Sequence, residues 1–452
     1  MTKGLSRREF VGTSAGAGVG FWMTGRQIGF GQEKSPNAKL NCAVIGAGGQ
    51  GGSSIGGVSK TENLVALCDI DKNRLNQAAS KFPEVKKYQD FRKMLEEMDK
   101  QIDAVCVATP DHLHAQAAAA AMRLGKHVYV EKPLTHNVHE ARFLRQLAAE
   151  KKVATQMGNQ GTSSGGLRRS VELVQAGALG TIKEIHIWTN RPVWPQAPDI
   201  MKRPSPEPVP ESLDWDLWLG PAPERPYSKR YAPFAWRGWW DFGTGALGDM
   251  ACHTANMAYW AAKLTAPTTV EAEAGDLNPE TFPSSARIRY EFPANGDRPP
   301  VTVWWYEGKK ANAENGKRDV KLLPPLELFH GEKIKDSGSL IVGTKGILYS
   351  PDDYGGARTL LPAKDFEGFQ APPKSIPDSP GHHAEWIRAC KGGPKAYSNF
   401  DYAGPLTEFV LLGNVAIKAG KKIEWDAEAL KVTNCPEANP WVSRERRKGW
   451  DL

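Results

Sequence analysis

The feature that most constrains this fold is a glycine-rich turn between an apolar run and a helical pattern. The run LNCAVIGAG is typical of a buried strand and leads into GAGGQG, which contains Gly46, Gly48 and Gly51. In such a G-x-G-x-x-G turn the first glycine permits a tight bend, the second lets the backbone approach a pyrophosphate, and the third lets helix and strand pack closely. The N-terminus of the following helix attracts the anion. The three glycines therefore predict a dinucleotide-binding turn.

An acid after the next strand supports this interpretation. NLVALCDID places Asp69 at the end of a second apolar run, 18 residues beyond Gly51. A carboxylate at this place accepts hydrogen bonds from a ribose 2′-hydroxyl. Asp71 would repel a 2′-phosphate, so the sequence favours NAD over NADP. The alternative is a glycine-rich turn without a ligand, and the flanking strand, helix and acid argue against it.

Strand-like runs and helical patterns alternate over residues 39–157. This spacing predicts a Rossmann-type α/β domain with a doubly wound parallel sheet. Residues 158–452 differ, because a proline-rich stretch over 192–233 predicts a long ordered loop. Segments such as ARIRYEF and VTVWWYE then alternate like antiparallel strands. We expect residues 158–452 to form a second, α+β domain with its own sheet and helices.

Composition narrows the class of protein. A net charge of +7 is modest for 452 residues, and no basic face repeats along the chain, which argues against a nucleic-acid partner. The six cysteines show no CxxC spacing, so we expect buried free thiols and no metal site.

The first 35 residues predict an export signal. SRREFVG contains the pair Arg7 and Arg8, and the weakly apolar run that follows is too short to span a bilayer, which needs about 20 residues. The pattern resembles a twin-arginine signal, which predicts a periplasmic protein without a stable membrane span. A basic tail without a targeting role is the alternative.

Two further strand ends predict parts of the cofactor site. ATPDHLH follows one strand at its carboxyl end, where open α/β sheets bind ligands, so we expect Thr109, Pro110 and His114 to border the dinucleotide. His112 and His114 have a spacing that could suit a metal, but no third ligand lies nearby, which favours capping and packing. By the same rule VYVEKP places Glu131 and Lys132 beside the nicotinamide.

The predicted second domain contributes two groups suited to acid–base chemistry. GDMACH places Asp249 and His253 four residues apart, on one helix face. Together with Lys132 they suit alcohol oxidation, in which a base takes the hydroxyl proton while hydride leaves the carbon. An ammonium group near the hydroxyl would stabilise the developing alkoxide. Taken alone, such a pair would more often be a surface or capping pair, but the glycine-rich lead-in WWDFGTGALGD indicates a tight backbone approach.

These motifs together resemble the glucose–fructose oxidoreductase/inositol dehydrogenase (Gfo/Idh/MocA) family, through GAGGQG, ATPDHLH, GKHVYVEKPL and GTGALGDMACH. The resemblance implies a second domain on an open, mostly antiparallel sheet and reactions on sugars, polyols and related compounds. It also implies that Lys132 is the catalytic lysine, His253 the acid/base and Asp249 its substrate-positioning partner, with Glu131 a cofactor or structural contact. Family members often pair through the open sheet, so the resemblance implies a homo-oligomer. The twin-arginine start and the tryptophan-rich loop resemble the exported branch of the family.

Tryptophans near the second domain's catalytic helix favour a carbohydrate substrate, because indole rings stack well on the apolar faces of sugars. The candidates in or near these loops are Trp188, Trp194, Trp236, Trp239 and Trp240. Arg191 and Arg237 could bind hydroxyls or a carboxylate. Trp304 and Trp305 lie in a strand, where we expect core packing.

Three functional hypotheses remain open at this point. The first is an NAD-dependent oxidoreductase that acts on a sugar or sugar derivative. The second is a glycoside hydrolase or lyase in which bound NAD transiently oxidises a ring hydroxyl. The third, a non-catalytic ligand-binding protein, is disfavoured by the Lys132, Asp249 and His253 set. An exported enzyme finds no free NAD outside the cytoplasm, so we expect the cofactor to be tightly bound.

Overall fold

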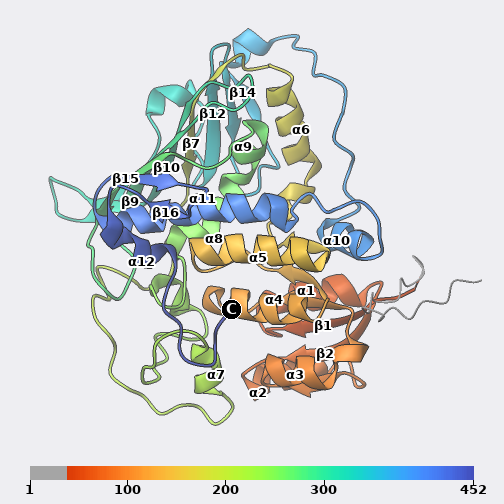
Figure 1. The fold of residues 1–452 in the computed structure, drawn as a ribbon. Coiled ribbons are helices and arrows are strands. Elements are labelled where there is room, and N and C mark those ends of the chain that lie inside the picture. The colour runs from red at the N-terminus through yellow and green to blue at the C-terminus, as the bar shows by residue number, and fades with distance from the viewer. Residues whose placement is uncertain (1–37) are drawn as a thin grey trace, which may run out of the picture. The chain divides into compact units, whose positions relative to one another are not determined.

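The first sheet of the protein is parallel and has six strands in the order β3-β2-β1-β4-β5-β6. The computed structural model describes residues 38–452, and the predicted export signal lies outside the described residues. The strands are β1 (Asn41–Ile45), β2 (Asn63–Cys68), β3 (Lys86–Tyr88), β4 (Ala104–Val107), β5 (His127–Val130) and β6 (Thr155–Met157). The helices that connect them are α1 (Gly51–Ser59), α2 (Lys72–Ala79), α3 (Phe91–Glu97), α4 (His114–Arg123) and α5 (Val138–Lys151) (Figure 1).

This topology confirms the predicted doubly wound sheet. The central strands β1 and β4 are almost entirely buried, as expected for apolar runs covered by helices on both faces. The chain passes from one side of the sheet to the other between β1 and β4. Ligands of open α/β sheets bind in the crevice at such a switch point, outside the carboxyl ends of the strands.

The second sheet has ten strands, and nine of them follow the order β14-β13-β12-β7-β10-β9-β8-β15-β16, with β11 paired to β10. The strands are β7 (Ile182–Trp188), β8 (Thr269–Gly275), β9 (Ser285–Phe292), β10 (Val301–Ala311), β11 (Arg318–Lys321), β12 (Gly338–Gly343), β13 (Ile347–Ser350), β14 (Thr359–Leu361), β15 (Ile423–Asp426) and β16 (Lys431–Val432). Only the β7–β10 pair within this described sheet is parallel, which confirms the mostly antiparallel architecture.

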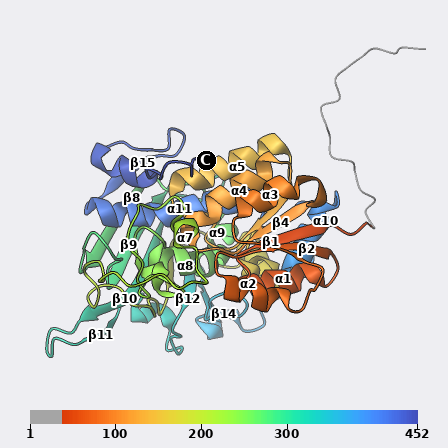
Figure 2. The ribbon, with the colours of Figure 1, turned by 90° about the horizontal axis from the view of Figure 1, so that it is seen from below.

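The second half of the chain also contains helices, and some of them lie between the two sheets (Figure 2). The helices of this half are α6 (Gly165–Gln175), α7 (Trp215–Leu219), α8 (Gly245–Thr254), α9 (Asn256–Ala261), α10 (His382–Cys390), α11 (Phe400–Ala419) and α12 (Asn439–Val442). Figure 2 shows α8 and α11 in the layer between the sheets, and α11 packs on α5, α8 and β8. Gly413 of α11 allows this approach, since a Cβ there would overlap the Tyr290 hydroxyl of β9.

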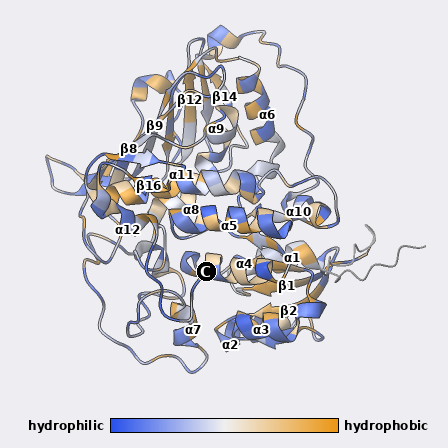
Figure 3. Cartoon of the chain, viewed as in Figure 1, coloured by the Kyte–Doolittle hydropathy of each residue, from blue (hydrophilic) through white to orange (hydrophobic). Residues whose placement is uncertain are grey.

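The predicted division into domains at residues 39–157 and 158–452 stays a prediction, and the described residues 38–452 pack as one compact unit. Trp386 of α10, for instance, is buried in the same apolar cluster as residues of β1 and β4. Figure 3 shows polar and apolar residues together on helices such as α5, as expected where one side of a helix covers a sheet. Within residues 38–452, no helix is both long enough and apolar enough to cross a bilayer.

Candidate active site

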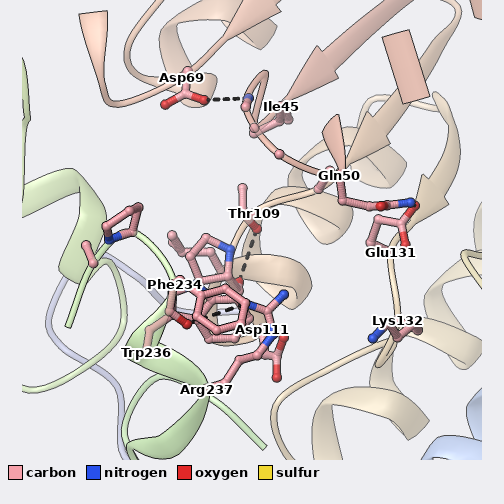
Figure 4. Close-up of a pocket in the computed structure, with 18 of the residues that line it drawn as sticks. Ile45, Gln50, Asp69, Thr109, Asp111, Glu131, Lys132, Phe234, Trp236 and Arg237 are labelled. Atoms are coloured by element: carbon pink, nitrogen blue, oxygen red, sulfur yellow. Dashed lines mark hydrogen bonds between the residues drawn. The ribbon is translucent and has the colours of Figure 1, made fainter. Parts of the chain in front are cut away.

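A single cavity of about 1200 Å³ extends from the glycine-rich turn to helix α8. Sites for one drug-sized molecule measure roughly 300–1,000 Å³, so this cavity has room for two ligands side by side. Its walls come from the carboxyl ends of the first sheet and from α8 and the proline-rich loop of the second half (Figure 4).

The glycine-rich turn is sterically fixed at two of its three motif positions. Gly46 has φ +87°, and a Cβ there would lie 2.5 Å from the carbonyl oxygen of Ala108. A Cβ on Gly51 would overlap the carbonyl oxygen of Gly46. A Cβ on Gly48 would meet the flexible side chain of Arg74 at 3.0 Å. The first and third glycines therefore shape the turn, while the second keeps its backbone accessible from the cavity.

Asp69 holds the turn in place from the end of β2. Its Oδ2 accepts hydrogen bonds from the N–H groups of Ala47 (2.9 Å) and Gly48 (3.2 Å), and its Oδ1 accepts one from Asp71 N–H (3.0 Å) (Figure 4). Burial raises the pKa of Asp69, and these three N–H groups act against that rise. Asp71 caps α2 by accepting from Asn73 N–H at 2.9 Å. Both carboxylates also line the cavity.

Of the remaining predicted cofactor contacts, Thr109, Pro110 and Glu131 line the cavity and His114 lies behind it. The buried His114 ring faces two carbonyl oxygens, Pro133 O at 2.7 Å and Thr109 O at 2.9 Å. Burial lowers its pKa to about 4. The structure thus places His114 between two loops behind the cavity edge and not in the cavity wall, and its single N–H, in the neutral ring, donates to one of the two carbonyl oxygens.

Glu131 offers an oxygen with no protein partner. Its Oε1 accepts from Gln50 Nε2 and from the Tyr129 hydroxyl, both at 3.3 Å. Its Oε2 is buried and has no hydrogen-bond partner among residues 38–452. Burial raises the pKa of Glu131 to about 7. A Cβ on Gly158 would overlap this carboxylate, so a glycine is required beside it. The unpartnered Oε2 of Glu131 and the space left beside it by Gly158 fit a ligand bound at the carboxyl end of β5.

Lys132 and Asp249 meet across 117 residues of sequence. Lys132 Nζ donates to Asp249 Oδ1 and to the Asp249 carbonyl oxygen, each at 2.8 Å. Burial alone would raise the pKa of Asp249, but Lys132 and then Arg237 lower it below its usual value. Asp249 is therefore ionised, and the ion pair ties the end of β5 to α8.

His253 lies one turn beyond Asp249 on α8 and lines the cavity. Its Nδ1 is buried without a hydrogen-bond partner in the described chain, and its ring packs edge-on against Tyr354, with centroids 4.8 Å apart. Burial and then the Lys132 ammonium lower the pKa of His253 well below its usual value. The imidazole is therefore neutral and able to accept a proton from a neighbouring hydroxyl.

The aromatic wall differs from the one expected. Trp194 lines the cavity, as do Phe234 and Trp236. Trp239 is fully buried and donates its indole N–H to Arg230 O, at 3.0 Å, within a separate apolar cluster. Trp240 packs on Phe282, at 3.7 Å between ring centroids.

The expectation that Trp239 and Trp240 contact a substrate is thus corrected. Burying these large apolar rings in the core stabilises the loop that carries Phe234 and Trp236. Trp188 is also fully buried. Trp305 packs in the core as expected, whereas Trp304, for which core packing was also expected, is only partly buried.

Two pairs that sequence reasoning missed complete the cavity. Asp111 Oδ2 accepts from the Thr244 hydroxyl (2.6 Å), and burial raises the pKa of Asp111 to about 7. Ser163 lies 2.9 Å from His382 Nδ1, while His382 Nε2 donates to Met157 O at 2.9 Å. Asp111 lies within the motif ATPDHLH, which could have identified it. The Ser163–His382 pair spans 219 residues and leaves no local signal.

Each ring nitrogen of the two histidines in the H-x-H pair lies against a carbonyl oxygen of the protein. His112 faces Trp218 O at 2.8 Å and Phe242 O at 3.2 Å, and His114 is held as described above. Among residues 38–452, no three His, Cys, Asp or Glu side chains are grouped as a metal site would require.

A doubly wound sheet whose switch point opens onto a Lys–Asp–His set defines a two-sheet dinucleotide-binding protein. Residues 40–159 match the family model described as "Oxidoreductase family, NAD-binding Rossmann fold", and residues 169–299 match the "Oxidoreductase family, C-terminal alpha/beta domain". The chain belongs to the Gfo/Idh/MocA oxidoreductase family.

Curated relatives share part of the chain. A "Glycosyl hydrolase family 109 protein" of Solibacter usitatus is 33% identical over 153 residues, which cover 30% of this chain and 34% of the relative. The "Levoglucosan dehydrogenase" of Pseudarthrobacter phenanthrenivorans is 27% identical over 182 residues, or 40% of this chain and 38% of the relative. The chain thus spans about a third of the length of these curated relatives.

Solved structures share the fold over most of the chain. The WlbA dehydrogenase of Bordetella pertussis, in complex with NADH and UDP-GlcNAcA, has a TM-score of 0.59 at 15% identity and covers 86% of this chain and 99% of its own. An inositol dehydrogenase homologue of Azotobacter vinelandii, complexed with NADH and myo-inositol, has a TM-score of 0.55 at 16% identity, with 87% and 100% covered. At this identity the likeness concerns the fold alone.

Proposed function

We propose that this protein is an NAD-dependent oxidoreductase that transfers hydride to or from a hydroxyl or ketone carbon of a sugar or sugar derivative. The observation that carries the proposal is the single cavity in which the glycine-rich turn and the set Lys132, Asp249 and His253 face the same space. When bound, NAD would supply the hydride chemistry.

The residues of the first sheet suit the cofactor. The N–H groups of the turn and the first turn of α1 are placed to bind a pyrophosphate. Asp69, which holds the turn and lines the cavity, would accept hydrogen bonds from the ribose hydroxyls, and the unpartnered Oε2 of Glu131 would lie at the nicotinamide end. The acidic pair Asp69 and Asp71 favours NAD over NADP.

The second half supplies the proton chemistry. His253, which is neutral and lines the cavity, would take the substrate hydroxyl proton during oxidation. Lys132 would donate a hydrogen bond to the same oxygen and stabilise its developing negative charge. Asp249 keeps Lys132 in position through the 2.8 Å ion pair. Trp194, Trp236 and Phe234 provide the apolar surface for a sugar ring.

A second candidate is a glycoside hydrolase or lyase in which a bound cofactor oxidises a ring hydroxyl transiently. Two curated relatives, at 33% and 31% identity, are glycosyl hydrolase family 109 proteins, and this similarity supports the hydrolase as the second candidate function. The same Lys132 and His253 roles would serve that reaction.

One experiment separates the two. The protein is purified without added cofactor, its NAD(H) content is measured, and it is incubated with NAD⁺ and a panel of free sugars and aryl glycosides. Net NADH formation, read at 340 nm, supports the oxidoreductase. Release of aryl alcohol without net NADH would reject it in favour of the hydrolase, and no turnover with any substrate would reject both.

Two further proposals rest on sequence and surface. We propose that the protein is exported by the twin-arginine route to the periplasm, with its cofactor tightly bound. The pair Arg7 and Arg8 supports this proposal, and retention of an Arg7→Lys/Arg8→Lys variant in the cytoplasm would support it further.

We also propose a homo-oligomer through the second sheet, whose strands β8 and β9 carry exposed Glu271, Glu273 and Arg289. A monomer mass by light scattering would reject it.

A further inference from the structure

The substrate end of the cavity gathers three cations around one carboxylate. Lys132 Nζ lies 2.8 Å from Asp249 Oδ1. Arg237 Nε lies 3.5 Å from the same oxygen, and Arg191 Nε lies 3.7 Å from Oδ2. Within residues 38–452, neither arginine forms an ion pair with any other acid. One negative charge is therefore shared by three positive charges.

The two guanidinium groups still have donors to offer. At 3.5 and 3.7 Å, their contacts with Asp249 are ion pairs without a direct hydrogen bond. Arg191 Nη1 donates to Asn190 Oδ1, and Arg237 Nη1 makes only a long, 3.5 Å contact with Phe234 O. Both side chains are about one quarter exposed, and both line the cavity. An incoming ligand can therefore reach them.

Arg237 is held ready for a ligand by aromatic rings. Its guanidinium carbon lies 4.3 Å from the Trp236 ring centroid and 4.9 Å from that of Phe234. Figure 4 shows Phe234, Trp236 and Arg237 gathered at one side of the cavity, with Lys132 across from them. Stacking of this kind reduces the freedom that the side chain would lose on binding.

The other acids nearby do not cancel the excess positive charge. Burial raises the pKa of both Asp111 and Glu131 to about 7, so these two carboxyls are only about half ionised at neutral pH. Asp353 also lines the cavity but forms no ion pair with either arginine in the described structure. Lys132, Arg191 and Arg237 thus outnumber Asp249 by two charges, and the partly protonated Asp111 removes only part of that excess.

We infer that the substrate is an acidic sugar whose carboxylate is bound by Arg191 and Arg237 beside the reacting carbon. This inference rests on the proposed function and adds the substrate class to it. The planar, forked donors of arginine match a carboxylate in two parallel hydrogen bonds. A hydroxyl group would leave the excess charge uncompensated. A phosphate dianion would also reduce this excess, so a sugar phosphate is included in the test.

The test compares ligands that differ only at the acid. Glucuronate, galacturonate and gluconate are each compared with their uncharged amides, with the parent aldose or polyol, and with glucose 6-phosphate. Binding is measured by calorimetry on the NAD-loaded protein, and turnover is measured by NADH formation. We expect at least one acid to bind ~100-fold more tightly than its amide.

Variants connect that preference to the two arginines. In Arg237→Gln and Arg191→Gln, the acid-to-amide ratio of binding constants should fall at least 10-fold. Arg203→Gln removes an arginine that pairs with Glu280 outside the cavity and should leave the ratio unchanged. The ratio cancels any loss common to both ligands, including loss from a disturbed Asp249.

Acids that bind no better than their amides would overturn the inference, whether or not turnover occurs. Tighter binding of the sugar phosphate than of every carboxylate would overturn it in favour of a phosphorylated substrate. Turnover of neutral sugars without any acid preference would refute the inference and leave the proposed function standing. Binding of an acid without hydride transfer would support the inference and count against the proposed function.

Discussion

Replacing Lys132 by methionine gives the sharpest test of the catalytic site. Methionine keeps much of the side-chain length and removes the charge and both 2.8 Å hydrogen bonds to Asp249. Loss of one preorganised donor at a developing oxyanion costs about 2.7–4 kcal/mol, or a ~10²–10³-fold fall in kcat. Asp249 keeps Arg191 and Arg237 as partners, so the loss of stability should be smaller, about 1–3 kcal/mol.

The chain offers a matched control at the opposite end of β5. Lys126 donates to an aspartate in the same way, with Nζ 2.7 Å from Asp99 Oδ1 and 2.5 Å from Asp99 O. Asp99 is 44% exposed, so Lys126→Met should cost only about 0–1 kcal/mol of stability. Because Lys126 lies away from the cavity, kcat should stay within about twofold of the unmodified protein.

The assay is NADH formation on whichever substrate the panel identifies, together with NAD⁺ titration by fluorescence and unfolding in urea. The expected pattern is a large fall in kcat for Lys132→Met with NAD⁺ affinity retained. If kcat falls less than about fivefold while the fold and cofactor binding are intact, the alkoxide-stabilising role of Lys132 is wrong. An equal fall in both lysine variants would also refute the reasoning.

Three further predictions test the cofactor turn, a buried acid and the aromatic wall. Gly51→Ala should abolish NAD⁺ binding in a fluorescence titration, because its Cβ would overlap the carbonyl oxygen of the first motif glycine, whereas Gly52→Ala, with open space around its Cβ, should bind normally. Burial raises the pKa of Glu307 to about 7 from 4.5, so the folded state keeps a proton that the unfolded state releases, and stability falls as the pH rises from 4.5 to 7. Glu307→Gln should therefore be more stable in urea at pH 8, by roughly 3 kcal/mol at most, and an advantage that persists at pH 4 would contradict this origin. Phe234→Ala, at a half-exposed ring on the cavity wall, should raise KM with little loss of stability, whereas Trp239→Ala should cost about 3–5 kcal/mol of stability, and the reverse pattern would contradict the assignment of these rings.

Much of the first sheet could be predicted because its signals are local. The shape of the turn depends on Gly46 and Gly51, where the backbone has no room for a side chain. Each apolar run in the sequence predicts a buried strand without information from the rest of the chain. Asp249 and His253 share a helix face for the same reason, since four residues make about one turn. The tryptophans could not be sorted in this way. In the sequence, Trp239 and Trp240 cannot be told apart from Trp194, because all three are tryptophans in or near the same loops. Only the packing shows that Trp239 and Trp240 lie in the core and that Trp194 lines the cavity.

The sequence by itself thus determined the dinucleotide turn, the parallel sheet and the identity of the groups available for proton transfer. Stereochemistry at glycine and the periodicity of apolar residues act over a few residues, so a single chain is enough to predict them. Tertiary structure decided which groups meet. It brought Lys132 to Asp249 across 117 residues, placed Arg191 and Arg237 around the same carboxylate, and buried His114 behind the cavity. Those outcomes depend on the packing of two sheets against shared helices, which no local pattern encodes.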